Sequence, residues 1–224
     1  MKLYSKLSAL GAVVVLSTAF ASATTIDIGS YATSSSAGSF GNSSTAFVSG
    51  PVGTAPTTYA LTNVTPTWTA ALGSSEWVGS TATSGPSGTV DPPFGTYVYT
   101  TTFTADSTFS GTIDVLADDT TSVLLNGVQI AGPGTGNDAH CQSVGIGCII
   151  PVTIPIGSFL NGTNTLEFDV IQAGILNPGK DPEGLDFNGS ISGGTTLTPE
   201  PSTLLLLGTG LIGSAGALFR RMRA

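Results

Sequence analysis

Residues 97–104 alternate between two kinds of side chain, and this alternation restricts the fold more than any other feature of the chain. One face of an extended strand would carry mostly aromatic groups and the other mostly threonine, as follows: Tyr97, Tyr99, Thr101 and Phe103 against Val98, Thr100, Thr102 and Thr104. A period of two built from aromatic and β-branched residues is typical of a half-buried strand. The segment therefore predicts a β-sheet with one face in a core.

Other short segments repeat this chemistry and are separated by turn residues. We expect strands near 111–117, 122–125, 128–130, 148–154, 165–171 and 185–191, with one or two more before residue 56. Asn126-Gly127 predicts a tight hairpin, because both residues tolerate positive φ, and residues 155–160 predict one short helical turn. Seven to nine short strands without long helical periodicity indicate an all-β fold, an antiparallel β-sandwich of the jelly-roll type.

The N-terminal residues have the pattern of a secretory signal peptide. Lys2 and Lys6 precede an apolar stretch at 7–20, and Ala21-Ser22-Ala23 supplies small residues for cleavage. We expect the signal peptide to cover residues 1–23 and the exported domain to cover residues 24–198.

The C-terminal residues 199–224 combine three parts in a fixed order. Pro199-Glu200-Pro201 comes first, an apolar run follows at 203–219, and Arg220, Arg221 and Arg223 close the chain. As a helix the run would be roughly 25 Å long, against about 30 Å for a bilayer core. The pattern predicts a transmembrane helix over 203–219, with the arginines on the cytoplasmic side and the preceding domain outside.

This tail resembles the PEP-CTERM sorting signal of Gram-negative bacteria in all three parts. The resemblance implies recognition by exosortase, a membrane processing enzyme, and processing near Pro199, Glu200 and Pro201. It further implies an exported protein that is anchored transiently in the inner membrane and then reaches the cell surface or the extracellular space, often in bacteria that make exopolysaccharide. An ordinary membrane anchor would explain the helix, Arg220 and Arg221, but it has no need of the Pro-Glu-Pro sequence.

The exported body has an unusually one-sided charge. Residues 24–198 hold one basic residue, Lys180, and thirteen acidic residues, which gives a formal net charge of −12. Such a surface cannot neutralise phosphates or bind anionic lipid through a polybasic patch. Nucleic acid is therefore excluded as a partner, whereas divalent cations and neutral sugars remain compatible.

Cys141 and Cys148 are the only cysteines, with six residues between them. In an exported chain this spacing predicts a local disulfide that pins a loop. A metal site is the alternative, because His140 precedes Cys141, but two cysteines and one histidine fall short of a usual four-ligand zinc set.

Two tryptophans, Trp68 and Trp77, stand nine residues apart. They would serve either as anchors of the core or as an exposed pair that stacks on sugar rings and so binds a ligand. Large aromatic side chains are more often buried than displayed, so the core interpretation is favoured.

Acidic residues in two predicted loops suggest a calcium site. Calcium takes oxygen ligands from carboxylates and loop carbonyls, and the candidates are Asp118, Asp119, Asp181 and Glu183. The alternative is that Asp118 and Asp119 hold turn backbone through hydrogen bonds. Paired carboxylates can also hydrolyse glycosidic bonds, but adjacent carboxylates on turns are usually solvated, and a hydrolase is disfavoured.

A second resemblance concerns the body. The segments 97–103, 117–119, 125–127, 162–168 and 184–186 resemble galactose-binding-like jelly rolls of exported bacterial proteins. That resemblance covers about residues 68–192 and says more about the fold than about the ligand. It also implies a calcium ion, because domains of this kind often carry one.

No catalytic set stands out in the body. Its single histidine, His140, lies in a glycine-rich loop, and no Gly-x-Ser-x-Gly elbow accompanies it. We therefore expect a non-catalytic surface or matrix protein associated with exopolysaccharide. The alternative is a structural envelope or biofilm protein without a small ligand; adsorption to ice through threonine-rich faces is disfavoured because the threonines form no sustained repeat.

Overall fold

The structure, a computed structural model, describes residues 23–35, 40–135, 141, 144–173, 181–194 and 201–222. The chain divides into two compact units, one formed by Ala23–Gly194 and the other by the two terminal segments. The predicted signal peptide lies outside the described residues, except for Ala23, so its assignment stays a prediction.

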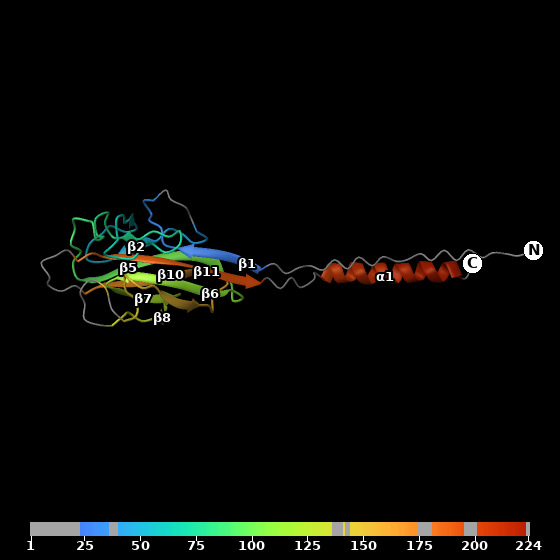
Figure 1. Cartoon of the computed structure of the whole chain (residues 1–224). Coiled ribbons are helices and arrows are strands. Elements are labelled where there is room, and N and C mark those ends of the chain that lie inside the picture. Colours follow the sequence, from blue (N-terminus) through green and yellow to red (C-terminus); the bar gives the residue numbers. More distant parts are fainter. Residues whose placement is uncertain are drawn as a thin grey trace, which may run out of the picture. The chain divides into compact units, whose positions relative to one another are not determined.

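Eleven strands form two sheets in the described part of Ala23–Gly194 (Figure 1). Their bounds are β1 Ala23–Gly29, β2 Ala46–Ser49, β3 Tyr59–Ala60, β4 Val78–Gly79, β5 Gly95–Ala105, β6 Ser110–Asp118, β7 Thr120–Leu125, β8 Val128–Ala131, β9 Val152–Ile156, β10 Gly162–Gln172 and β11 Gly184–Gly194. All strand pairs are antiparallel. The predicted antiparallel β-sandwich is confirmed, while its finer assignment as a jelly roll stays a prediction.

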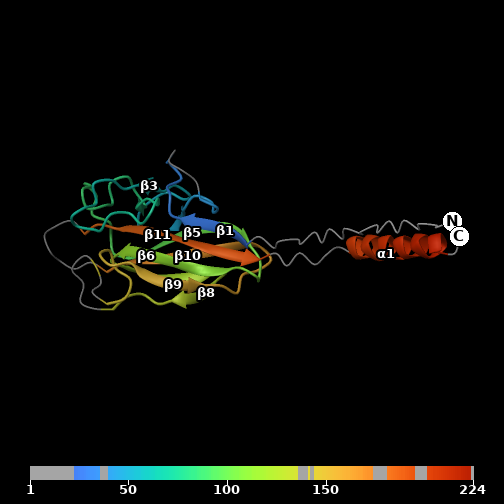
Figure 2. The ribbon, with the colours of Figure 1, turned by 45° about the vertical axis from the view of Figure 1, so that its right-hand side comes forward.

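The first sheet has the order β3-β4-β11-β6-β9, and β1 also pairs with β11. The second sheet has the order β2-β5-β10-β7-β8. The long strands β5, β6, β10 and β11 make up the body of the two layers in both views (Figures 1 and 2). The chain passes from the first sheet to the second through one residue, Asp119, which separates β6 from β7.

The core between the sheets is built by the predicted alternation. Tyr97, Tyr99 and Phe103 of β5 are at most 3% exposed. Phe168 of β10 stacks on Phe187 of β11 with ring centroids 4.6 Å apart, so the two sheets meet through aromatic rings. Burying each such side chain stabilises the fold by about 1.5–3 kcal/mol.

The predicted hairpin turn is confirmed at Asn126 and Gly127, whose φ angles are 52° and 78°. They join β7 to β8, and a turn with positive φ at both central positions matches the twist of the strands. The side chain of Asn126 also donates to Oδ1 of Asn164, 2.8 Å away, which ties the turn to β10.

Part of the first sheet is covered on its outer face as well. Ile113, Val115 and Ala117 of β6 belong to the core between the sheets, whereas Leu116 packs with Trp68 and Trp77 in a second cluster. The segment between β2 and β5, drawn in teal and green tones in Figure 1, supplies these tryptophans. This double coverage explains why β6 ends in four buried residues rather than in an alternation.

Two local predictions differ from the structure. The expected strand at 148–154 lies at Val152–Ile156 instead, and the expected helical turn at 155–160 is absent from these described residues. Pro155 is part of β9, where it faces Thr112. Its missing N–H is tolerated because β9 is the edge strand of its sheet.

The terminal unit contains α1, Pro201–Met222. A helix is thus present where one was expected, beginning at a proline, which suits the first turn of a helix. Its predicted role of crossing a membrane is not supported, because no helix within the described part of the chain is long and apolar enough to span one.

Candidate functional site

Both tryptophans lie inside the second cluster, and each is 1% exposed. Their ring centroids are 4.3 Å apart, and the ring planes differ by 31°. The core interpretation therefore holds. The alternative of a sugar-stacking pair is wrong for this structure, because neither ring offers an exposed face to a ligand.

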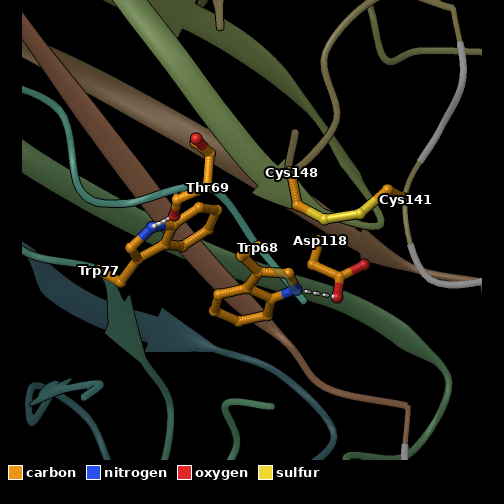
Figure 3. Close-up of a disulfide and its surroundings, with 6 residues drawn as sticks. All are labelled: Trp68, Thr69, Trp77, Asp118, Cys141 and Cys148. Atoms are coloured by element: carbon orange, nitrogen blue, oxygen red, sulfur yellow. Dashed lines mark hydrogen bonds between the residues drawn. A yellow bond between two sulfur atoms is a disulfide. The ribbon is translucent and has the colours of Figure 1, made fainter. Parts of the chain in front are cut away.

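The predicted disulfide between Cys141 and Cys148 is confirmed, with Cα atoms 5.4 Å apart. Cys148 is buried against the two tryptophans, and Cys141 is half-buried. Figure 3 shows the disulfide beside Trp68 and Asp118. His140, the extra ligand considered for a metal site, lies outside the described residues.

Asp118 is the last residue of β6 and is fully buried. Its Oδ2 accepts a hydrogen bond of 2.6 Å from Nε1 of Trp68, while Oδ1 receives no hydrogen bond from the residues that the structure describes. A carboxylate oxygen of Asp118 and both sulfurs lie within 4.8 Å of one another. Burial raises the pKa of the Asp118 carboxyl well above its usual range, and the nearby charge of Asp119 adds to this effect.

The negative charges of Asp119 and Asp181 act on Asp118, but these two residues also make hydrogen bonds elsewhere. Oδ2 of Asp119 accepts a hydrogen bond of 2.7 Å from the backbone N–H of Ala173. The backbone N–H of Asp181 donates to Asp91, and its carbonyl accepts from the amide of Gln172.

Glu183 occupies a separate site inside the sandwich. Tyr99 donates its hydroxyl proton to Oε1, and the backbone and hydroxyl of Ser80 donate to Oε2 over 3.3 and 3.0 Å. Burial raises the pKa of Glu183 to about 7, although these hydrogen bonds act in the opposite direction. Both carboxylate oxygens of Glu183 thus accept hydrogen bonds from protein groups.

Calcium binding by the four predicted ligands, Asp118, Asp119, Asp181 and Glu183, stays a prediction. Among the described residues, the group of three acidic, histidine or cysteine side chains that is compact enough for one ion consists of Asp118, Cys141 and Cys148. Asp181 and Glu183 are not part of it. The sequence could not show this separation, because Glu183 faces the core between the sheets while Asp118 lies against the tryptophans outside the first sheet.

A buried acid that the sequence reading missed is Asp186 of β11. Its Oδ1 accepts from the hydroxyls of Ser30 and Ser75, and its Oδ2 accepts from the backbone N–H of Leu72 over 2.8 Å. Asp186 therefore fastens two irregular segments to the first sheet. Asp186 lies between Leu185 and Phe187 in β11 and faces the other side of the sheet, and no local sequence signal shows that loops cover that side.

The outer face of the second sheet is polar and accessible. Thr100, Glu167 and Asp169 are half-buried and Thr102 and Thr104 are exposed. Glu167 stands directly opposite Thr100 in the pairing of β10 with β5. The face therefore offers hydroxyl donors beside carboxylate acceptors.

An apolar groove of about 670 Å³ lies where edge strands β8 and β9 approach one another. Its lining includes Val128, Ile130 and Leu160. Val128 and Leu160 are 67% and 57% exposed, so the groove opens to solvent.

Of the residues predicted to form the sorting motif, Pro201 begins α1 and Arg220 and Arg221 lie exposed in its last turn. Pro199 and Glu200 lie outside the described residues. No curated protein and no solved structure matches the chain, so the galactose-binding-like assignment gains no support from comparison. Residues 197–223 match the PEP-CTERM protein-sorting motif. The chain therefore carries the sorting motif of an exported protein that exosortase, a membrane enzyme, processes.

Proposed function

We propose that this protein is a non-catalytic component of the cell surface or extracellular matrix that associates with exopolysaccharide after sorting. The observation that carries the proposal is the PEP-CTERM motif at residues 197–223. The motif supports export and sorting by exosortase. The acidic body with its single lysine limits the binding partners to those that do not need a basic protein surface.

The polar face of β5 and β10 supports an association with sugars. Thr100, Thr102 and Thr104 present hydroxyl groups, and Glu167 and Asp169 present carboxylates next to them. Hydroxyl groups both donate and accept hydrogen bonds, and carboxylates accept them, which suits the hydroxyl-rich surface of a polysaccharide. This face takes the place of the buried tryptophans as the candidate contact surface.

A test of the sorting step follows the mature C-terminus by mass spectrometry. The full chain is expressed in a Gram-negative host with its cognate exosortase and in the same host without it. We expect the first host to release a protein that ends near the Pro-Glu-Pro sequence and the second to retain Ala224. A triple variant with Pro199→Ala, Glu200→Ala and Pro201→Ala serves as the control and should stay unprocessed.

An intact C-terminus in the host that carries the exosortase would contradict the proposal. An unprocessed triple variant beside a processed wild type would show that the cut depends on this motif rather than on general proteolysis.

The groove between β8 and β9 favours a second candidate, a structural protein of the envelope or biofilm whose role is assembly. Exposed apolar side chains beside two edge strands are a common contact surface between proteins. Sedimentation of the processed protein with purified exopolysaccharide distinguishes the two functions. Co-sedimentation supports the first, and self-association without co-sedimentation supports the second.

A further inference from the structure

The carboxyl group of Asp118 lies beside the two sulfurs of Cys141 and Cys148, and a disulfide does not need a carboxyl group next to it. Three potential ligand atoms, two sulfurs and one carboxylate oxygen, lie within 4.8 Å of one another. Small side-chain rotations can bring such atoms to zinc distances of about 2.3 Å for sulfur and about 2.0–2.2 Å for oxygen.

The carboxyl group of Asp118 is also oriented as metal-binding carboxylates usually are. Trp68 donates to Oδ2 and fixes the group, while Oδ1 is fully buried and receives no hydrogen bond from a donor among the described residues. The side chain of Asp119 is the acidic neighbour of this carboxyl group. In Figure 3 the second oxygen points away from the Trp68 nitrogen and toward the side of the disulfide. Ligating carboxylates are typically held in this way by an outer hydrogen bond, which leaves the other oxygen for the ion.

We propose that the reduced form of this protein binds one zinc ion through Cys141, Cys148 and Asp118, so that the loop carries either a disulfide or a metal. Two thiolates and one carboxylate would give three protein ligands and leave one position of a tetrahedral site for water. Half-buried Cys141 provides the entry path to an otherwise buried site.

The disulfide form can be converted to the dithiol form with a phosphine as the reductant. The phosphine takes the oxygen of one water molecule and becomes its oxide, while the two water protons go to the sulfurs as the S–S bond breaks. Zinc binding then releases both thiol protons to solvent, because thiolate is the form that ligates.

The test uses the full-length chain, reduced with a phosphine and titrated with Co²⁺ and then Zn²⁺. Cobalt bound by thiolates in a tetrahedral site gives a charge-transfer absorption that carboxylates on an acidic surface do not give. We expect one Co²⁺ per reduced chain with this absorption, its displacement by Zn²⁺, and no such absorption from the oxidised chain.

Three variants separate the proposed ligand from its surroundings. Asp118→Asn should weaken zinc binding roughly tenfold or more, since it removes a charged ligand, and Trp68→Phe should weaken it roughly tenfold by releasing the outer hydrogen bond. Asp186→Asn is the matched control, because this buried acid accepts from Ser30, Ser75 and Leu72 rather than facing the sulfurs. Its zinc affinity should equal that of the wild type.

The proposal fails if the reduced wild type shows no thiolate absorption with Co²⁺, or if it unfolds and Zn²⁺ does not restore its circular dichroism. Equal zinc affinity of the wild type, Asp118→Asn and Trp68→Phe would also overturn it, since the cysteines alone would then account for binding. If Asp118→Asn does not fold, the comparison of Trp68→Phe with Asp186→Asn decides.

Discussion

Glu183 and Asp186 are both fully buried, although the described part of the body contains no lysine or arginine to pair with them. Tyrosine and serine hydroxyls and backbone N–H groups take the place of cations. Asp118 receives one indole N–H in the same way. A buried carboxyl group that depends on neutral donors makes each of those donors important for stability.

Replacing Trp68 by phenylalanine should therefore destabilise the protein more than replacing Trp77. Trp68→Phe leaves Oδ2 of buried Asp118 without a donor, which costs about 1–3 kcal/mol beyond the lost packing. Trp77→Phe frees the carbonyl of Thr69, which is half-buried and can accept from water. Urea denaturation of both variants under oxidising conditions measures the difference, and equal losses in the free energy of unfolding would contradict the role of the Trp68–Asp118 bond.

The burial of these tryptophans could not be predicted with certainty from the sequence. Trp68 and Trp77 lie in a segment without periodicity, and their partners are Leu116 and Cys148, more than thirty residues away along the chain. Residue type favoured a core position, but only the placement of the segment over the first sheet decides between core and surface.

Strands were predictable where one face is buried and the other is solvated. β5 and β10 alternate along their whole length, and the sequence alone identifies both. β3 and β4 have two residues each and are set by their neighbours, Leu185 of β11 among them. The end of β6 is buried on both faces, so alternation is lost there although the strand continues to Asp118.

The loop between β8 and β9 is fastened by the disulfide, and its reduction should have a measurable cost. Cross-linking two residues with a sequence separation of seven removes chain entropy worth about 2–3 kcal/mol from the unfolded state. We expect a phosphine in metal-free buffer to lower the free energy of unfolding by that amount in urea denaturation.

A double variant with Cys141→Ala and Cys148→Ala is the control for this measurement. Its stability should not respond to the reductant. A wild type that is equally stable with and without the phosphine would show that the cross-link does not constrain the unfolded chain.

At the scale of the whole molecule, the buried acids make stability depend on pH. Burial raises the pKa of Glu183 from its usual 4.5 to about 7 and also raises the pKa of Asp186. At these two positions the folded state therefore holds more protons than the unfolded state, so their contribution to stability is largest at or below pH 4.5 and is lost as pH rises, for Glu183 through about pH 7. For Glu183, which faces Tyr99 and Tyr97, this loss amounts to roughly 3 kcal/mol.

The variant Glu183→Gln isolates this contribution, because its side chain stays neutral. We expect the difference in the free energy of unfolding between pH 4.5 and pH 8 to be roughly 3 kcal/mol smaller in the variant than in the wild type. Glu167→Gln on the half-buried outer face of β10 is the matched control. An unchanged pH dependence in Glu183→Gln would show that another group is responsible.

The arrangement of the whole molecule was predictable in class but not in its details. Composition and the terminal patterns predict a sandwich domain between the two ends of the chain, and the compact unit that holds the strands covers Ala23–Gly194. The exact domain boundaries stay a prediction. The sites were less predictable, because Asp118, Cys141 and Cys148 meet through the crossing from β6 to β7 and the fold of a distant loop. Neither feature has a local sequence signal.

The pairing of β1 with β11 has a consequence for maturation. Ala23 and Gly194 are register partners at the same end of the first sheet. If leader and tail are both cut away, the described residues next to the two cuts lie side by side. A short peptide could then join them into a ring, and the hairpin at Asn126 and Gly127 could be opened in exchange, which makes the body a natural scaffold for circular permutation.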